Sequence, residues 1–205
     1  VTEESNGYVT ELIKNFSSNE SVDINHRAIG GVTFKLLPYI LPQILDMDPE
    51  SNHIIFEIAS CNRFEESVDD YIAHLEDIGE ICRSRGMSYS FVNLFRANVD
   101  YPSDLLIPAI LKFSKSNNIK VLDTYKKINE DNVTYYLRDG IHTNPNGAVF
   151  YAAEIQRFIN SELLAYSDFE KKNLPNLSSL MRLKSSKRFV PFSELEIGAS
   201  FETGY

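Results

Sequence analysis

The chain has 205 residues, 43% of them hydrophobic, which suits one ordinary globular domain with a single core. Its formal net charge of -9 and its sequence pI near 5.0 disfavour nucleic acid or an anionic membrane surface as the main partner, and favour a neutral or cationic small molecule. It contains no run of about 18 apolar residues and no basic-then-apolar leader, so we expect no membrane span and, by default, a cytoplasmic location.

Helical and strand patterns alternate along the chain without repeats or low-complexity tracts. In chain order the predicted elements are a helix from Tyr8, a strand over 22–24, a helix over 36–45, a strand over 53–59, a helix from Val68 to about Gly86, a strand over 87–95, a helix over 105–113, a strand over 119–123 and a helix from Pro145 to about Leu164. Pro38 and Pro42 should make the second helix irregular or kinked. The alternation indicates βαβ units and a parallel sheet, in which ligands bind at the carboxyl ends of the strands.

The character of the sequence changes after the last of these helices. Residues 167–187 are rich in Lys, Ser and Asn with weak periodicity, which indicates a linker that follows a core over 1–166. Residues 188–197 have strand character and lead into a loop that contains Ser200. We expect this strand and loop, residues 188–205, to complete the same domain.

A polar loop just before the last helix carries Asp139 three residues ahead of His142. At this spacing the carboxylate can orient the imidazole while the other ring nitrogen faces a reacting group, as a general base requires. Asn144 is in the position of a helix N-cap and Pro145 in that of the first helical residue. The alternative is that Asp139 and His142 only satisfy turn and cap hydrogen bonds.

This loop, an earlier glycine-containing loop and the residues after the strand predicted over 53–59 together resemble the SGNH (GDSL-like) hydrolases. That family contains esterases, lipases, carbohydrate deacetylases and some acyltransferases. The D-x-x-H block of the family is matched by Asp139, His142, Asn146 and Gly147, its glycine block by Asn25, Gly30, Gly31 and Thr33, and its G-x-N-D block in part by Ser60-Cys61-Asn62-Arg63. In the partial block, serine replaces the glycine and arginine the aspartate, and a shift of one residue would put Cys61 in place of Asn62. The resemblance covers roughly residues 5–160 and implies a flavodoxin-like, three-layer α/β/α fold around a mostly parallel five-stranded sheet.

The chain departs from the family in the position of the nucleophile block. In the family G-D-S-x-x-x-G comes first, whereas here nothing before the first helix matches it, and the good candidate is Gly198-Ala199-Ser200 with Gly204. If Tyr205 were followed in space by Val1, the blocks would stand in the family order, so we expect a circularly permuted arrangement. The alternatives are a chance glycine–serine pair and the opening of an accessory module.

The resemblance implies a serine triad that uses no metal and no cofactor. Ser200 would be the nucleophile, His142 the general base and Asp139 the carboxylate that steadies the imidazolium. The backbone N–H groups of Ser200 and Gly31 and the side-chain amide of Asn62 would form the oxyanion hole. The implied activity is hydrolysis of an O-acyl ester of a small or carbohydrate alcohol, with an O-acyltransferase and a catalytically inactive binding module as alternatives.

Four further residues have less specific interpretations. His26 and Arg63 are candidate substrate contacts, although a backbone hydrogen bond for His26 and pairing of Arg63 with a neighbouring glutamate are the plainer interpretations. Cys61 and Cys82 fit neither a zinc pattern nor a disulfide framework, so both are expected to be reduced thiols. The oligomeric state is open.

Overall fold

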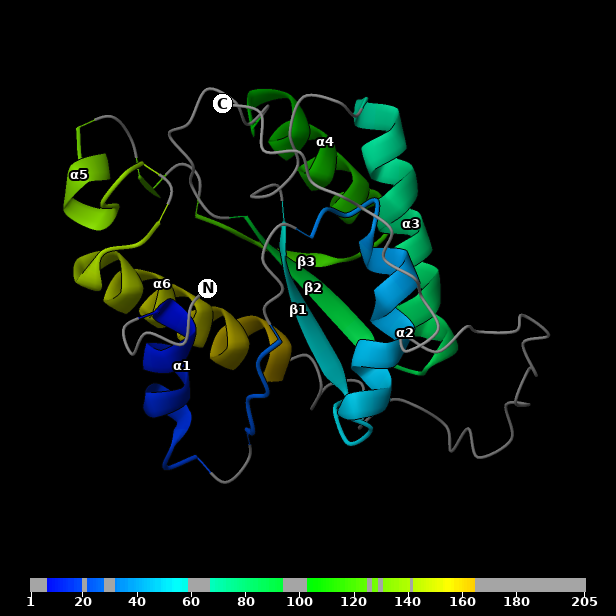
Figure 1. Ribbon diagram of the computed structural model, residues 1–205, viewed down its shortest axis with the longest axis horizontal. Helices are drawn as coiled ribbons and strands as arrows, with labels where there is room; N and C mark the ends of the chain where they lie inside the picture. The colour runs from blue at the N-terminus through cyan, green and yellow to red at the C-terminus, as the bar shows by residue number, and fades with distance from the viewer. Residues whose placement is uncertain are drawn as a thin grey trace, which may run out of the picture.

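The structure is a computed structural model of residues 1–205, and it describes residues 7–19, 22–27, 32–58, 67–93, 103–124, 127–128, 131–140 and 142–164. In chain order its elements are α1 (Tyr8–Phe16), α2 (Leu37–Met47), β1 (His53–Ile58), α3 (Val68–Ser84), β2 (Ser88–Asn93), α4 (Ser103–Ser116), β3 (Lys120–Asp123), α5 (Val133–Tyr136), α6 (Pro145–Phe158) and the π-helical segment η2 (Ile159–Leu164). They form three layers, with helices on both faces of a parallel sheet (Figure 1). No helix within the described ranges is long and apolar enough to cross a membrane.

The described sheet has three parallel strands in the order β1-β2-β3. Phe56 of β1 pairs with Phe91 of β2, which pairs in turn with Val121 of β3. Because side chains alternate between the two faces of a strand, these three side chains point to the same face. β2 is the central strand, and its residues 90–93 are all buried.

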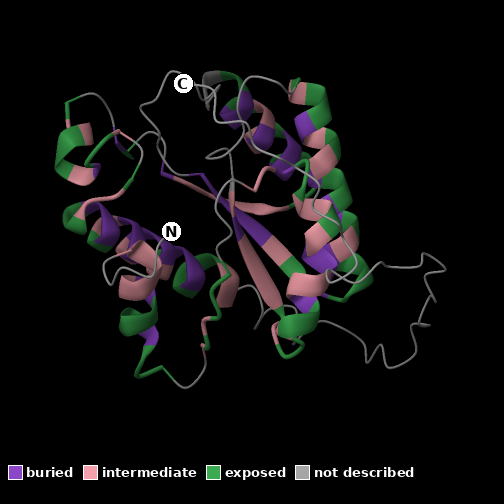
Figure 2. Ribbon diagram, in the orientation of Figure 1, coloured by how far each residue is buried: buried purple, intermediate pink, exposed green. Residues whose placement is uncertain are grey.

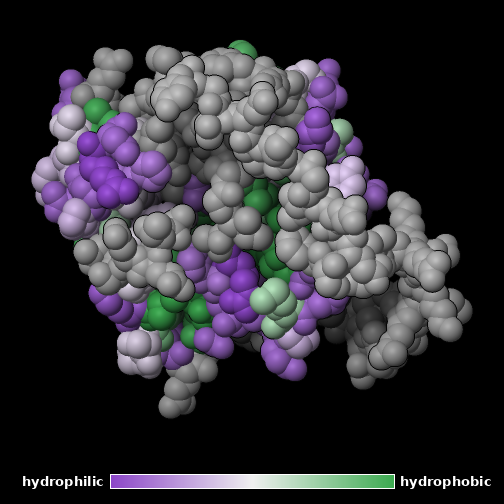
Figure 3. Space-filling model, in the orientation of Figure 1, coloured by the Kyte–Doolittle hydropathy of each residue, from purple (hydrophilic) through white to green (hydrophobic). Residues whose placement is uncertain are grey.

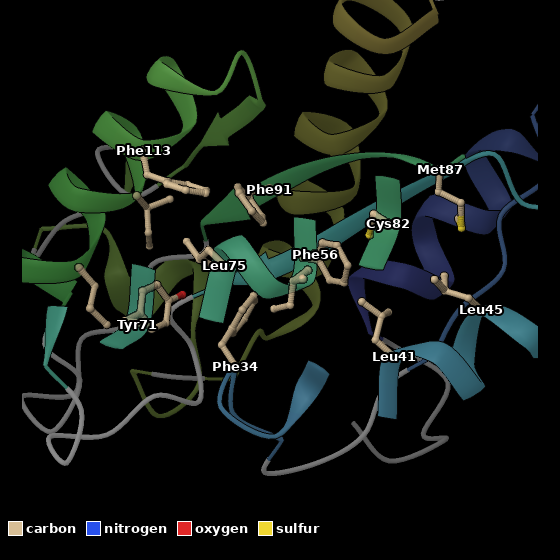
Figure 4. Close-up of a cluster of buried hydrophobic side chains, with 13 residues drawn as sticks. Phe34, Leu41, Leu45, Phe56, Tyr71, Leu75, Cys82, Met87, Phe91 and Phe113 are labelled. Carbon is tan, nitrogen blue, oxygen red and sulfur yellow. The ribbon is translucent and has the colours of Figure 1, made fainter. Parts of the chain in front are cut away.

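The face that carries Phe56 and Phe91 is covered by α2, α3 and α4, and the two layers enclose the larger apolar cluster (Figure 4). α3 begins at the N-cap Ser67, whose hydroxyl accepts the N–H of Asp70, and its apolar face is turned into this cluster. Cys82 lies on that face with no exposed surface, as a free cysteine, and burial raises the pKa of its thiol to about 12. The thiol is therefore protonated and inert near neutral pH.

α1 and α6 cover the opposite face of the sheet around a second apolar cluster. Leu12 and Phe16 of α1 and Tyr151 and Ile155 of α6 meet Val92 of β2 there. Figure 2 shows the buried residues of α6 and α3 on the sides of these helices that face the sheet. Each face of the sheet therefore has its own core.

The direction of α6 follows from an ion pair at its far end. Lys120, the first residue of β3, contacts Glu162 of η2 over 3.0 Å. The end of α6 and η2 thus lies at the amino ends of the strands. The start of α6, with the loop that contains His142, therefore lies toward the carboxyl ends, where parallel α/β sheets bind ligands.

The predicted order of helices and strands agrees with the described elements, with two corrections. Residues 22–24 take no regular structure where a strand was predicted, because no described strand pairs with them and an isolated segment cannot form a ladder. The second helix runs from Leu37 to Met47, with Pro38 in its first turn, where its missing N–H costs nothing, and with Pro42 inside it. α5 was not predicted, because a four-residue helix is too short to show a helical period.

Several predictions fall on residues outside the described ranges. The described sheet has three of the five predicted strands. The linker 167–187 and the final strand and loop, 188–205, lie outside the described residues, as do Cys61 and the end of the strand predicted over 87–95.

Candidate active site

The chain between α5 and α6 forms a short hairpin. Leu137 and Thr143 form an antiparallel bridge at its base. Gly140 has φ 77°, a left-handed conformation that glycine adopts without strain. The hairpin presents Asp139 and His142 near its tip.

Asp139 and His142 are in direct contact. Oδ2 of Asp139 lies 2.7 Å from Nδ1 of His142, and Oδ1 accepts the backbone N–H of His142 over 2.7 Å. An ionised carboxylate only accepts hydrogen bonds, so Nδ1 carries the proton of the neutral ring and Nε2, on the other side of the ring, has the free lone pair. The side chains are 47% and 62% exposed, respectively. The pair therefore holds a basic nitrogen ready in a position that solvent and substrate can reach.

The hairpin is attached to the first turn of α6 by backbone contacts. Asn144 is the N-cap: its side chain accepts the N–H of Gly147 over 3.0 Å and donates to the carbonyl of Tyr135 over 2.9 Å. A Cβ on Gly147 would lie 2.0 Å from the carbonyl oxygen of Tyr136, so only glycine lets the helix and the hairpin approach this closely. The predicted N-cap Asn144 and first helical residue Pro145 are confirmed.

Aromatic rings connect this attachment to the core. The rings of Tyr136 and Phe150 lie 4.7 Å apart, and Phe150 lies 5.4 Å from Tyr151, which has no exposed surface. Tyr135, in contrast, is 59% exposed and meets Tyr136 edge-on. The position of the hairpin is therefore supported by α6 and by the core beneath it.

The other predicted site residues are not joined to this pair by any described contact. Ser200, Gly31, Asn62 and Arg63 lie outside the described residues. His26 is described, in an exposed segment, where its backbone carbonyl accepts a hydrogen bond from Nη1 of the adjacent Arg27. Partial burial lowers the pKa of His26 below its ordinary value, which favours the neutral ring at neutral pH.

A third histidine lies between two serines at the amino ends of the strands. Nδ1 of His53 is 2.7 Å from Oγ of Ser88, and Nε2 is 2.9 Å from Oγ of Ser90. Because the Ser88 hydroxyl donates to the carbonyl of Asn52, the ring donates from Nδ1 to Ser88 and accepts at Nε2 from Ser90. Burial lowers the pKa of His53 to about 4. Ser90 has no exposed surface and cannot meet a substrate, so this cluster is structural.

Sequence reasoning missed a buried amide at the carboxyl end of β2. Asn93 has no exposed surface, and its Oδ1 accepts the backbone N–H of Thr124 over 2.9 Å. Its Nδ2 has no partner among the described residues. The available signal was an asparagine in the predicted strand 87–95, and its side chain links the carboxyl ends of β2 and β3.

A cavity of about 410 Å³ lies at the opposite end of α6, beside β3. Its charged groups are paired with one another: Lys120 with Glu162 over 3.0 Å, and Arg157 with Glu154 over 2.5 Å. Within the described ranges no group of three His, Cys, Asp or Glu side chains is placed to hold a metal ion. These charges are therefore structural, and the Asp139–His142 pair remains the candidate site.

Three solved structures show which known fold this architecture matches. A psychrotrophic esterase from Pseudoalteromonas sp., in a form inhibited by monoethylphosphonate, matches with a TM-score of 0.65 and 15% identity over 79% of this chain and 90% of its own. A member of the lipolytic protein G-D-S-L family from Veillonella parvula matches at 0.62 and 15%, over 78% and 91%. A Geobacillus acetyl-xylooligosaccharide esterase matches at 0.60 and 15%, over 76% and 82%.

No protein-family model and no curated protein sequence matches the chain. The structural likeness establishes the fold: the chain has the three-layer α/β/α architecture of the G-D-S-L lipolytic proteins and esterases.

Proposed function

Starting from this fold, we propose that the chain is a serine ester hydrolase that removes a short acyl group, such as acetyl, from a small or carbohydrate alcohol. The observation that carries the proposal is the contact of Asp139 Oδ2 with His142 Nδ1, on a hairpin at the carboxyl edge of the sheet. This contact leaves Nε2 as a base, and the motifs around Gly31, Asn62 and Ser200 match the remaining parts of such a site. The esterases among the structural neighbours support the same reaction class.

In the first half of the reaction Ser200 Oγ attacks the ester carbonyl carbon and gives its proton to His142 Nε2. The tetrahedral oxyanion accepts hydrogen bonds from the backbone N–H groups of Ser200 and Gly31 and from the Asn62 amide. The C–O bond then breaks, and the alcohol leaves with the proton held by His142. The acyl group remains on Ser200 as an ester.

Water completes the second half of the reaction. It attacks the acyl carbon and gives a proton to His142 Nε2, and the collapse of the intermediate returns that proton to Ser200 and releases the carboxylic acid. His142 is 62% exposed, so water has ready access to the base, which favours hydrolysis over transfer to a second alcohol. His26 and Arg63 would contact the alcohol part of the substrate, and the net charge of -9 favours a neutral or cationic alcohol.

The test is active-site labelling with a fluorophosphonate, followed by turnover of p-nitrophenyl acetate. The natural chain should be labelled at Ser200, and Ser200→Ala should be neither labelled nor active. Ser178→Ala, in the predicted linker, is the matched control and should behave like the natural chain. A natural chain that keeps its fold but is not labelled at Ser200 would instead be the inactive binding module.

His142→Ala tests the base separately. We expect kcat to fall by at least about 10³-fold. The side chain is exposed, so the free energy of unfolding should change by no more than about 0.5 kcal/mol. Normal turnover by His142→Ala would remove this residue from the mechanism.

A further inference from the structure

The short helix α5, which leads into the Asp139–His142 hairpin, buries little of its own surface. None of its four residues is buried, and Val133 and Tyr136 are half-buried against the cluster beneath α1 and α6. Figure 3, in the orientation of Figure 1, shows mostly hydrophilic surface over α5. Apolar burial of α5 itself therefore contributes little to its position, and polar contacts must help to place it.

Lys127 connects three elements through three different groups. Its backbone N–H donates to the carbonyl of Thr124, the residue after β3, over 3.0 Å. Its backbone carbonyl accepts a hydrogen bond from Nδ2 of Asn132, the N-cap residue of α5, over 3.2 Å. Its side-chain Nζ contacts Oε2 of Glu154, on α6, over 2.5 Å. Lys127 thus joins the end of the sheet to α5 and to α6.

The contact with Thr124 leads to the central strand. The hydroxyl of Thr124 donates to the backbone carbonyl of Asn93, and its backbone N–H donates to Oδ1 of the same residue. Asn93 is the last residue of β2, and neither it nor Thr124 has any exposed surface. Lys127 is therefore connected to the carboxyl end of the central strand, the edge at which parallel α/β sheets bind ligands.

Glu154 supplies the second part of this connection from a buried position. Its side chain is 7% exposed, and its other described partner is Arg157, which is 67% exposed. A buried ion pair often stabilises a fold no more than apolar side chains of similar size would, because the charges lose their hydration. The pair does have a preferred direction and distance, which apolar packing of α6 on the sheet lacks. Its main effect is therefore on geometry.

We propose that Lys127 and Glu154 are positioning residues for the candidate base. Together they set the place of α5 and of the hairpin, and so of His142 Nε2, relative to the carboxyl ends of the strands. Neither side chain touches the substrate in this role. A displacement of about 1 Å between reacting groups can slow a reaction by about 10²-fold, so such a link affects turnover from a distance. The effect on turnover rests on the proposed function.

The test compares Lys127→Met with the double variant Lys127→Met/Glu154→Met, using p-nitrophenyl acetate. The single variant leaves the buried carboxylate without its lysine, so both the melting temperature and kcat should fall. The double variant buries no charge here, so its melting temperature should return to within about 4 °C of that of the natural chain. Its kcat should nevertheless stay about 10- to 10²-fold low, with KM changed by less than about twofold. Natural kcat in the double variant would make the pair purely structural and overturn the proposal.

The matched control lies at the other end of α6. Lys120 forms an ion pair with Glu162 of η2 over 3.0 Å, at the amino ends of the strands. Lys120→Met/Glu162→Met removes this pair by the same substitutions and should keep the natural kcat. An equal fall in kcat in the control would mean that loss of any ion pair along this helix slows turnover, and would also overturn the proposal.

A further measurement needs no turnover. In proton–nitrogen correlation spectra, the amide signals of hairpin residues 138–140 and 142–144 should move in Lys127→Met/Glu154→Met but not in the control. Unmoved hairpin signals would overturn the positioning role. Moved signals in a chain that fluorophosphonate does not label would keep the placement of the hairpin and reject the hydrolase. Labelling at Ser200, together with natural kcat in the double variant, would keep the hydrolase and reject the positioning role.

Discussion

At the scale of single residues, the candidate site depends on a carboxylate that binds both the ring and the backbone of one histidine. Asp139 accepts both the ring Nδ1–H and the backbone N–H of His142, so it sets the tautomer and the orientation of the ring together. Both bonds span only three residues, which is why the sequence spacing alone was enough to predict the contact.

Asp139→Asn should therefore impair the base without unfolding the chain. An amide can present its NH₂ to Nδ1 and so favour the wrong tautomer, with the proton on Nε2. By analogy with triads in general, kcat for p-nitrophenyl acetate should fall by about 10⁴-fold, with a small change in KM. The exposed position limits the loss of stability to about 0.5 kcal/mol. A variant with unchanged kcat would show that the carboxylate has no catalytic part.

His53 should make the chain less stable in weak acid. Its pKa is about 4 in the folded chain and 6.5 ordinarily, so between these values the unfolded chain binds the proton more readily. This contribution to stability is present above pH 6.5 and is lost as the pH falls toward 4, in total about 3 kcal/mol.

The comparison is urea unfolding at pH 7 and pH 4.5 for the natural chain and for His53→Gln. Glutamine can bond to both Ser88 and Ser90 but does not titrate. Between pH 7 and pH 4.5, the free energy of unfolding of the natural chain should fall by about 2 to 3 kcal/mol more than that of the variant. Equal losses would show that His53 is not the titrating group.

At the scale of elements, the hairpin and α6 act as one unit. The N-cap Asn144 bonds to both, and Gly147 brings the helix against the carbonyl of Tyr136. The sequence predicted the cap and the helix start, because capping depends on neighbouring residues. It did not predict the contact of Gly147 with Tyr136, because that contact depends on how two elements pack.

Gly147→Ala should separate the hairpin from α6. The new Cβ meets a backbone oxygen at 2.0 Å, which no side-chain rotation can relieve. We expect the free energy of unfolding, measured in urea, to fall by about 1 to 3 kcal/mol. Ester turnover should also fall, because Asp139 and His142 move with the hairpin. The control is Val149→Ala, on the same helix but at a position that is 58% exposed. Its free energy of unfolding should stay within about 0.5 kcal/mol of that of the natural chain. Natural stability and turnover in Gly147→Ala would contradict the close approach.

At the scale of the whole molecule, the sheet separates two apolar clusters, and β2 contributes to both. Phe91 lies in the cluster beneath α2, α3 and α4, and Val92, the next residue, lies in the cluster beneath α1 and α6. The central strand therefore couples the two cores, and we expect the described layers to unfold together.

Phe91→Ala tests this coupling. Phe91 has no exposed surface and contacts the rings of Phe56 and Tyr89. Its truncation should lower the free energy of unfolding by about 3 to 5 kcal/mol. Unfolding in urea should still occur in a single transition. Tyr39→Ala, at a position 77% exposed, should cost no more than about 0.5 kcal/mol. Two separate transitions would show that the layers unfold independently.

The sequence by itself determined the features that depend on near neighbours: the alternation of strands and helices, the N-cap at Asn144, and the contact of Asp139 with His142. Only the tertiary structure decided which faces meet, because packing joins residues far apart in the chain. It left residues 22–24 without a strand, set Gly147 against Tyr136, and placed the His53 cluster at the end of the sheet away from His142. A periodic pattern shows which side of an element is apolar but not which element will cover it, since that choice depends on the shapes of both surfaces.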